Sequence, residues 1–404
     1  MRVGIIGCGT AGAAAAIALA RAGGEIEVLE RVAEPRPVGA GIMLQPTGQA
    51  VLARLGLYEQ VAARAAPIDR LYLRTRGGRT LADLRYAAID PAWRALGIHR
   101  GVLFEALYRA ACSEPRVTVR TGCDVQSLRR DGSRVYAIDG DGVDRGPFDL
   151  VVIADGAQSA LRGHVMPGAR DAAYPWGALW FVTEDRERAF SGELYQVAHG
   201  ARRLYGALPT GLGPRGEAPI VSLFWSLAAR DHDAWRAGGL DAWKREVLAM
   251  DARIAPVLDA ITEPEQVTFA RYRDVRVPRV HVDRVVLVGD AAHATSPQLG
   301  QGANLALLDA LALADCVAAA PDDVPGALDA FAGVRRRHVG YYQRMARWLT
   351  PLFQHHSRVL GWMRDVTFPI ANAVPPLRRH MVRTMAGVAL GFSPRRLELP
   401  ARVE

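Results

Sequence analysis

The sequence predicts an α/β fold made of a parallel-sheet domain, an inserted antiparallel β-sheet and a C-terminal helical tail. Three observations support this fold class. Residues 1–30 run strand, glycine-rich turn, helix and strand, which is the pattern of a βαβ unit. Residues 174–226 place aromatic side chains in β-like segments between Gly and Pro turns, which is typical of an antiparallel sheet. Residues after 320 keep apolar side chains at helical spacing.

Composition places the chain among globular proteins. Its 404 residues can bury a large core, and 50% of them are hydrophobic. The net charge of +8 comes from arginines dispersed among acidic residues, with Lys244 as the only lysine and no nucleic-acid-binding motif. We therefore expect the arginine bias to be mostly compositional, with local electrostatic use for an anionic cofactor, and we expect no nucleic-acid partner.

Several absences predict a cytoplasmic protein. No run of 18 uninterrupted apolar residues is present, so we expect no transmembrane segment. Met1–Ile6 enters a strand at once, which leaves no room for a signal peptide. The four cysteines are widely scattered, which fits a reducing compartment. Neither they nor the pair His355–His356 have the spacing of a metal site.

The first element is a complete βαβ unit. Val3–Ile6 reads as a buried strand, residues 13–22 are strong helix formers that stop at a Gly pair, and Glu25–Glu30 reads as a second strand. A lone Gly-x-Gly-x-x-Gly is weak evidence, but here it lies between a strand and a helix. This context predicts dinucleotide binding.

The glycines and the acid that follows them have separate tasks in that prediction. Gly7 makes the turn, Gly9 lets a pyrophosphate approach the backbone, and Gly12 lets helix and strand pack closely. Glu30 ends the second strand, where its carboxylate can bind both hydroxyls of an adenosine ribose. An acidic residue here predicts FAD or NAD and argues against NADP.

Shorter elements follow. Val38–Pro46 is a Gly-spaced extended stretch that can run along a ligand, and residues 47–55 are expected to form a helix. Two β-like runs around a Gly pair predict a hairpin over residues 68–85. Arg100 precedes a predicted helix over residues 101–108, where it can grip a phosphate or flavin oxygen. The alternative is an exposed N-terminal arginine.

Two later strands deliver polar residues at their ends. Short strands are predicted over residues 117–120, 124–130, 134–139 and 148–153. The last is followed by Asp155–Gly156, with Arg162 further on, a set that suits a polar ligand. Residues 285–288 form another buried strand, after which Gly289 lets the backbone turn and presents Asp290 as an acceptor for a ribose or ribityl hydroxyl.

A turn after this strand leads into a buried helix. Pro297–Gly302 is rich in Pro and Gly, and residues 303–314 have the length and apolar spacing of a core helix. Free N–H groups and partial positive charge at the helix N-terminus would lie beside the ligand of Asp290. An ordinary strand–turn–helix corner is the alternative interpretation.

The remaining segments are aromatic strands and helices. Residues 240–249 predict a helix, and the tail after residue 320 is predicted to be helical with breaks at Pro351, Pro369 and Pro375–Pro376. The tail mixes apolar and basic residues, which allows docking on the main body or peripheral contact with lipid or a partner. The aromatic residues of the β-like region are expected mainly in the core; they are Trp176, Trp180, Phe181, Tyr195, Tyr205, Phe224 and Trp225.

Three segments together resemble the class A FAD-dependent monooxygenases, of which para-hydroxybenzoate hydroxylase is a familiar member. The segments are Gly7-x-Gly9-x-x-Gly12 with Glu30, Asp155–Gly156 with Arg162, and Gly289–Asp290 with Pro297-x-x-Gly300-Gln301-Gly302-x-Asn304. Their order and approximate spacing fit across residues 1–315. The resemblance implies a Rossmann-like, glutathione reductase-like FAD-binding domain with an inserted substrate-binding sheet.

The expected domain limits follow this division. The FAD-binding domain would comprise residues 1–67, 98–172 and 276–320. A sheet hairpin over 68–97 and a substrate-binding β domain over 173–275 would interrupt it, and residues 321–404 would form the helical region.

The resemblance also implies cofactor-binding roles. The pyrophosphate would lie on the glycine loop, the adenosine ribose on Glu30 beside Arg31, and the ribityl chain on Asp290. Arg100 would reach the FAD chain, while Asp155 and Gly156 would serve FAD and the passage of NAD(P)H. The residues against the isoalloxazine ring would be Pro297, Gly300, Gly302, Ala303 and Asn304. His293 is expected to be structural.

The implied activity is that of a monooxygenase with NAD(P)H as external reductant. NADH or NADPH would bind transiently and reduce FAD, O₂ would add to the reduced ring, and the flavin hydroperoxide would hydroxylate an aromatic or polyketide-like molecule. The helix N-terminus near Gly302 would stabilise the reduced, anionic ring. For a phenolic substrate the candidate proton acceptors are Tyr195, Tyr205 and His199, with Pro297 beside the ring.

Alternatives share parts of this evidence. A flavin-dependent reductase, dehydrogenase or epoxidase of an isoprenoid-type substrate would have the same fold. A flavin-holding carrier without turnover would not need the ring-side turn Pro297–Asn304. A flavin-dependent halogenase is disfavoured, because its Trp-x-Trp-x-Ile-Pro segment is absent and Lys244 lies in a distant predicted helix.

Overall fold

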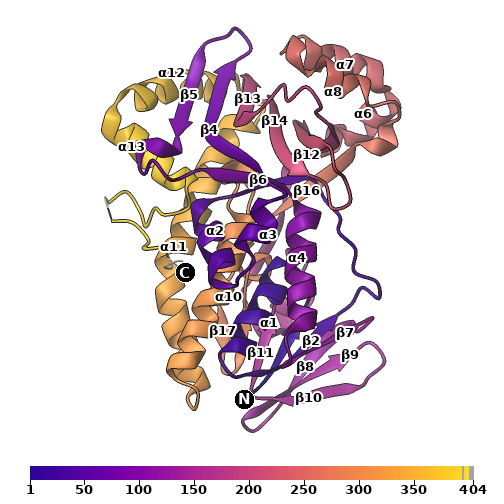
Figure 1. Ribbon diagram of the computed structural model, residues 1–404, viewed down its shortest axis with the longest axis vertical. Coiled ribbons are helices and arrows are strands. Elements are labelled where there is room, and N and C mark those ends of the chain that lie inside the picture. Colours follow the sequence, from indigo (N-terminus) through magenta and orange to yellow (C-terminus); the bar gives the residue numbers. More distant parts are fainter. Residues whose placement is uncertain (394, 400–404) are drawn as a thin grey trace.

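A six-stranded sheet forms one half of the molecule in the computed structural model, which describes residues 1–393 and 395–399 (Figure 1). In spatial order its strands are β17 (His281–Val282), β18 (Val285–Leu287), β11 (Leu150–Ile153), β1 (Arg2–Ile6), β2 (Glu25–Glu30) and β7 (Val117–Thr121). From β18 to β7 every neighbouring pair is parallel. The strands expected from sequence at these places are found, and their carboxyl ends share one edge of the sheet.

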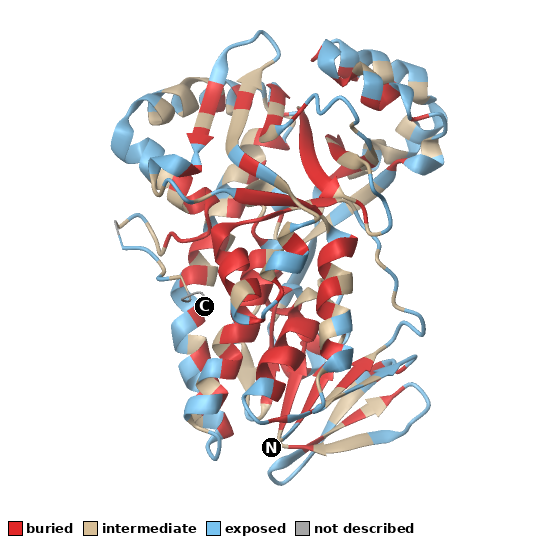
Figure 2. Cartoon of the chain, in the orientation of Figure 1, coloured by how far each residue is buried: buried red, intermediate tan, exposed pale blue. Residues whose placement is uncertain are grey.

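Helices cover this sheet, and their buried sides belong to the core shown in red in Figure 2. They are α1 (Thr10–Arg21), α2 (Pro46–Arg54), α3 (Tyr58–Ala62), α4 (Arg100–Ser113) and α10 (Gly302–Ala319). The alanine-rich α1 is buried along ten consecutive residues, because small side chains let α4 and α10 approach closely. Each of the predicted helices in this half is present.

Helix α10 lies between α1, α2 and α11 (Val324–Phe353). Among the described residues it is the one helix with the length and hydropathy that a membrane span needs. However, 61% of its residues are buried inside the protein, and Asp309 in its middle is paired with buried partners. These contacts identify α10 as a core helix.

The second half is built on a larger sheet. Its strands in order are β16 (Thr268–Arg276), β12 (Arg170–Glu184), β15 (Pro219–Ala228), β14 (Arg203–Leu212), β13 (Gly192–His199), β4 (Ala66–Thr75), β6 (Ala95–His99) and β3 (Gly41–Leu44), with β5 (Thr80–Arg85) on β4. The hairpin predicted over residues 68–85 is β4–β5.

The expectation of a purely antiparallel sheet is wrong at one place. Strands β13 and β4 pair in parallel, so the sheet is mixed. These two strands come from distant parts of the chain and no hairpin joins them, so nothing imposes antiparallel order. The extended stretch around Gly41–Leu44 also joins this sheet, through β6.

Smaller elements complete the fold. A three-stranded sheet contains β8 (Val125–Asp131), β9 (Arg134–Asp139) and β10 (Asp144–Phe148). The short helices are α5 (Leu161–Val165), α6 (His232–Ala237), α7 (Leu240–Leu248), α8 (Ala255–Asp259) and α9 (Asp290–His293). The single-turn 3₁₀ helices are Tyr86–Ala88, Ala229–Asp231, Ala252–Ile254, Pro264–Gln266 and Pro297–Leu299.

The C-terminal region is helical, as predicted, but two of the predicted breaks are wrong. Pro351 lies inside α11 (Val324–Phe353) and Pro369 lies inside α12 (Arg358–Ala373). Each proline removes one backbone hydrogen bond. In α11 the missing bond falls in the last turn, where the loss of stability is small. Helix α12 is held by packing of the Phe353 and Phe368 rings, which lie 5.8 Å apart. The third break is found where Pro375 begins α13 (Pro375–Met385).

Candidate functional site

Loops from three distant parts of the chain meet at one edge of the parallel sheet. They follow β1, β11 and β18, which are adjacent and point the same way. A Cβ added to Gly7 would lie 2.6 Å from the carbonyl oxygen of Ala154, and one added to Gly289 would lie 2.8 Å from the Cβ of Ala11. Ligands of open α/β sheets bind at such carboxyl edges.

The glycine loop after β1 forms an open backbone cradle. A Cβ on Gly12 would lie 1.9 Å from the carbonyl oxygen of Gly7, so only glycine permits this approach of helix and strand. At Gly9, in contrast, an added Cβ would meet nothing within 4 Å. Gly9 caps α1 without a side-chain hydrogen bond, which leaves the first N–H groups of the helix available. This arrangement fits a pyrophosphate.

Glu30 lies beside this cradle at the end of β2. Its Oε2 accepts a hydrogen bond from the backbone N–H of Cys8 at 2.7 Å, and its Oε1 accepts from Val32 at 2.9 Å. Both oxygens keep a lone pair for ribose hydroxyls. Arg31 is exposed next to it. Arg100 is also exposed, at the start of α4, and its side chain packs over Gly39.

The loop after β11 holds an unpartnered carboxylate oxygen. Oδ1 of Asp155 is buried and has no hydrogen-bond partner among the described residues. Burial raises the pKa of Asp155 above its usual value. A ligand hydroxyl would satisfy this oxygen, so the predicted position fits a polar ligand.

Arg162 connects the second and third segments. Its guanidinium is buried and donates to the carbonyl oxygens of Ala291 in α9, at 3.0 Å, and Ala157, at 2.9 Å. It also pairs with Asp171 at the start of β12. These contacts are all made within the protein, so the role of Arg162 is to hold the two loops in position.

The third segment presents Asp290 beside the N-terminus of α10. Gly289 adopts φ 59°, which lets the chain turn from β18 into α9. A Cβ on Gly302 would meet only Oδ1 of Asp290, at 3.8 Å. Helix α10 has no side-chain cap, so its first N–H groups are free beside this carboxylate. The predicted juxtaposition of acid and helix N-terminus is therefore present.

The side chain of Asn304 does not point outward with the ring-side turn. It is fully buried, where its Oδ1 accepts from the N–H of Gln45 at 2.8 Å. Its Nδ2 donates to the carbonyl oxygens of Met43 and Gly300, both at 3.0 Å. Asn304 thus clamps the turn to β3, while Pro297 remains exposed at the start of the turn. The sequence motif predicted the place of this turn, but it did not predict that the side-chain amide of Asn304 points into the protein.

A buried charge network supports the turn at Gly289. Oδ2 of Asp309 accepts from the Gly289 N–H at 2.9 Å and from Nε2 of His293 at 2.6 Å. Its Oδ1 accepts from Nε of Arg335 at 2.7 Å. Burial alone would raise the pKa of Asp309, but His293 and Arg335 outweigh it and hold that pKa far below its usual value. His293 therefore has the structural position expected of it.

His338 extends the network to the C-terminal segment. Its Nε2 donates to the carbonyl oxygen of Gly387 at 2.7 Å, so Nδ1 accepts from Arg335 at 3.0 Å. Burial, together with the charge of Arg335, lowers the pKa of His338 to about 3. Sequence reasoning missed this group; its signal was Asp309, an acid in the apolar middle of α10.

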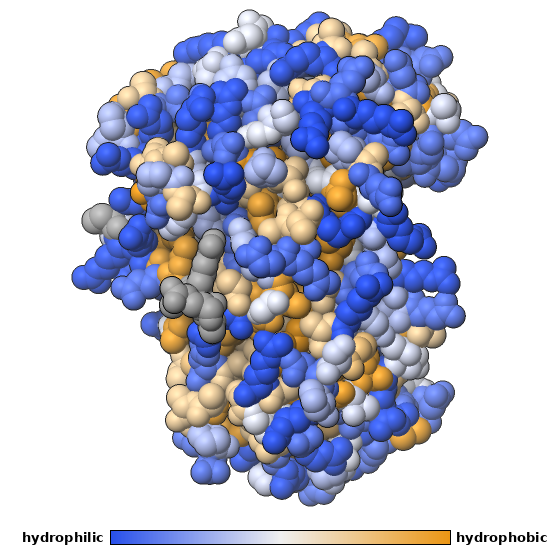
Figure 3. Space-filling model, in the orientation of Figure 1, coloured by the Kyte–Doolittle hydropathy of each residue, from blue (hydrophilic) through white to orange (hydrophobic). Residues whose placement is uncertain are grey.

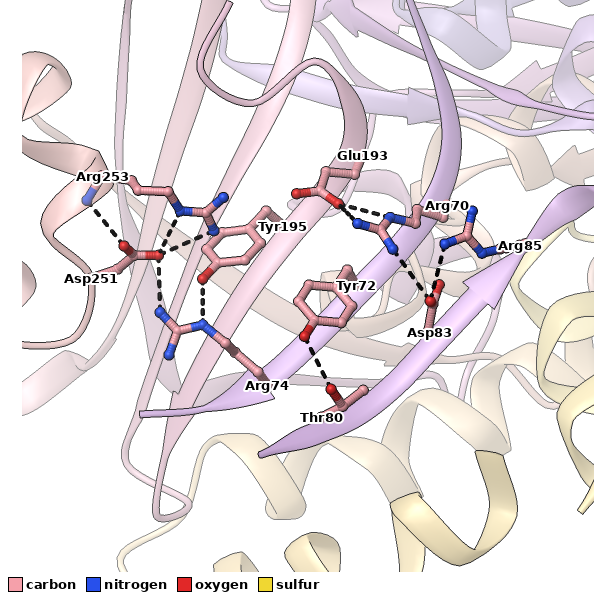
Figure 4. Close-up of polar contacts among 10 residues, drawn as sticks. All are labelled: Arg70, Tyr72, Arg74, Thr80, Asp83, Arg85, Glu193, Tyr195, Asp251 and Arg253. Atoms are coloured by element: carbon pink, nitrogen blue, oxygen red, sulfur yellow. Dashed lines mark hydrogen bonds and ion pairs between the residues drawn. The ribbon is translucent and has the colours of Figure 1, made fainter. Parts of the chain in front are cut away.

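The candidate proton acceptors lie away from the ring-side turn. Tyr195 and Tyr205 pack with α7 and α8 on the far face of the large sheet. The Tyr195 hydroxyl accepts from Nε of Arg74 at 2.5 Å (Figure 4), and the Tyr205 hydroxyl is buried without a partner among the described residues. His199 is exposed at the end of β13. Side chains alternate along a strand, so both tyrosines lie on the face of the sheet opposite to that of Leu204 and Phe224.

Other aromatic residues line the opposite face. Phe224 packs in the same cluster as Met43 of β3. The carbonyl oxygen of Met43 accepts a hydrogen bond from Asn304, which ends the ring-side turn. The Phe224 and Trp180 rings lie 5.2 Å apart, and Nε1 of Trp180 donates to the Tyr272 hydroxyl at 3.3 Å. Figure 3 shows apolar atoms gathered at the waist between the two halves of the molecule. We call Trp180, Phe224 and Tyr272 the aromatic face.

The FAD binding domain family matches residues 1–340 of the chain. A probable 2-heptyl-3-hydroxy-4(1H)-quinolone synthase of Rhodococcus erythropolis is 31% identical over 78% of this chain and 78% of its own length. A kynurenine 3-monooxygenase of Salinispora arenicola is 31% identical over 83% of this chain and 76% of its own. The chain belongs to the family of FAD-dependent monooxygenases.

A solved structure shows the same fold. HpxO of Klebsiella pneumoniae, complexed with FAD and uric acid, superposes with a TM-score of 0.80 over 97% of this chain and 98% of its own, at 22% identity. The cofactor of this monooxygenase family is FAD, and the glycine cradle, the unpartnered Asp155 oxygen and the open α10 N-terminus all fit it.

Proposed function

We propose that this monooxygenase consumes NADH or NADPH and O₂ to hydroxylate a small aromatic or polyketide-like molecule. The observation that carries the proposal is the meeting of three loops at one sheet edge, with the aromatic face on the adjoining side of the large sheet. A flavin carrier would need the loops but not an aromatic surface joined to the ring-side turn.

Each protein group has a defined task in this proposal. The amides at Gly9 and the start of α1 would bind the pyrophosphate, and Glu30 would bind the adenosine ribose. Asp290 would hold the ribityl chain, and the α10 N-terminus at Gly302 would stabilise negative charge on the reduced ring. When bound, FAD supplies the redox chemistry, taking two electrons from NAD(P)H and activating O₂. No side chain of the aromatic face is proposed as a base.

The aromatic face favours a neutral, planar substrate. Along β14 and β15 the residues opposite the α7 side are uncharged; they are Leu204, Gly206, Leu208, Thr210, Ser222 and Phe224. A buried carboxylate on the substrate would need a cationic partner there. Aromatic rings stack on Phe224 and Trp180 without one. One relative is named as a probable synthase of a quinolone, so its named product is a planar aromatic molecule of this kind.

A substrate screen tests the proposal. Neutral aromatic compounds, quinolones among them, are offered to the FAD-loaded protein, and NAD(P)H consumption is followed with product mass. We expect a compound that accelerates consumption and gains one oxygen atom. Turnover of a substrate without O₂ would favour the alternative, a reductase or dehydrogenase. A product with a three-membered ring on an isoprenoid-type double bond would favour an epoxidase.

We also propose a cytoplasmic location. All four cysteines are free, and two of them, Cys8 and Cys123, are buried as thiols. Fractionation of the host cell that places the protein with secreted proteins would contradict this.

A further inference from the structure

Helix α12 buries a charged side chain and leaves several large apolar side chains exposed. Its inward side holds Gly361, Arg364 and Phe368, and of these Arg364 is fully buried. The guanidinium donates to the carbonyl oxygens of Gly200 at 2.9 Å and Leu352 at 3.1 Å. A Cβ on Gly361 would lie 2.7 Å from the backbone nitrogen of Ala201. A charged side chain thus anchors α12 to the turn between β13 and β14.

The outward side of α12 is apolar. Val359, Trp362 and Ile370 are 62%, 66% and 57% exposed, and Met363 is 43% exposed. Their spacing of three, four and seven residues places them on one side of the helix, within an arc of about 120°. The surface continues past the helix end, where Val374 and Leu377 are exposed. We call these six residues the α12 ridge; Figures 1 and 2 show α12 itself on the rim of the molecule.

The charges on the two helices that carry the ridge are mostly positive. Helices α12 and α13 together contain five arginines and one acidic residue, Asp365, which is already paired with Arg364. Arg358, Arg378 and Arg379 are exposed at the two ends of the ridge. A second copy of this chain would bring the same positive charges together, which disfavours self-association. An anionic partner suits both the apolar ridge and its basic ends.

We propose that the α12 ridge docks this protein on an anionic lipid surface. A helix that lies in a membrane interface carries Trp and aliphatic side chains on one side, with arginines placed to meet the headgroups. Trp362, Ile370 and their neighbours would enter the acyl boundary, while Arg358, Arg378 and Arg379 would contact lipid phosphates. Arg364 anchors the helix in the orientation that this requires. The inference does not depend on which substrate is oxidised.

Vesicle sedimentation with the full-length, FAD-loaded protein tests the inference. The probes are vesicles of phosphatidylcholine alone and of phosphatidylcholine with phosphatidylglycerol. We expect binding to the anionic vesicles at least about tenfold stronger than to the neutral ones, weakening as salt is raised. Ile370→Glu should reduce the partition coefficient at least about tenfold, and the double change Arg378→Gln, Arg379→Gln should reduce both binding and its salt dependence.

Val143→Glu is the matched control, because Val143 is 43% exposed on the distant turn between β9 and β10. It should bind vesicles as the unchanged protein does, and all variants should keep their FAD content. Absence of binding to either vesicle, equal binding to both, or equal loss in the control would overturn the proposal. Light scattering that shows a concentration-dependent dimer, abolished by Ile370→Glu, would also overturn it, since the ridge would then join two copies.

Discussion

Replacing Asp309 with asparagine removes the negative charge that balances Arg335 in the core. The side chains of Asp309 and Arg335 are 2% and 5% exposed, so water cannot replace the lost partner. Asparagine also places an amide group where one carboxylate oxygen accepts from Gly289 and His293. Breaking a buried ion pair by removing one partner costs about 3–5 kcal/mol. The free energy of unfolding should fall by that amount in urea titrations of the FAD-free protein.

The same substitution on the surface of α10 supplies the control. Asp315 pairs with Arg54 at 3.1 Å, but the two side chains are 54% and 36% exposed. Exposed pairs of this kind contribute about 0–1 kcal/mol, so Asp315→Asn should be nearly neutral. Equal losses in the two variants would refute the assignment of a stabilising role to the buried network. Because Asp309 holds the Gly289 turn, Asp309→Asn should weaken FAD binding as well.

Three other changes probe separate parts of the account. Glu30→Ala removes a charged acceptor of two backbone N–H groups, and hydrogen bonds to charged groups contribute about 1.5–3 kcal/mol each. The FAD dissociation constant of the variant, measured by flavin fluorescence titration, should therefore rise at least about tenfold. The pKa of His338 is about 3 in the folded protein, whereas an unfolded chain protonates this side chain near pH 6.5. Its contribution to the free energy of unfolding is therefore complete above pH 6.5 and is lost as the pH falls toward 3. His338→Gln should reduce this loss, by up to about 1.4 kcal/mol per pH unit, in denaturation at pH 7 and pH 5. Phe224→Ala should raise KM for an aromatic substrate several-fold in steady-state assays, whereas the same change at Phe104, a half-buried residue of α4 outside the aromatic face, should not.

Features encoded by local spacing could be predicted from the sequence. The strand, the glycines and Glu30 form one continuous βαβ unit, so their arrangement follows from chain connectivity. Gly289 and Asp290 were located in the same way, because a turn after a buried strand places its residues at the strand's carboxyl end. Their meeting with the glycine loop followed from the rule that parallel strands share that edge.

Features that depend on which face of an element is buried could not be predicted. Tyr195 and Tyr205 were candidates because they lie in the aromatic sheet. Because side chains alternate between the two faces of a strand, both lie on the side of the sheet that α7 covers. The direction of Asn304 depends on β3, which is more than 250 residues away in the sequence. In α12 the periodic apolar side faces outward, because Arg364 is satisfied by the turn at Gly200. Tertiary partners decide each of these cases.

Titration of the purified, flavin-free protein with FAD tests the central claim most directly. The three converging loops predict a yellow complex with one FAD per chain, and Asp290→Ala should fail to form it at the same concentrations while retaining its fold by circular dichroism. A protein that stays colourless in excess FAD, or an Asp290→Ala variant that binds FAD unchanged, would contradict the site described here.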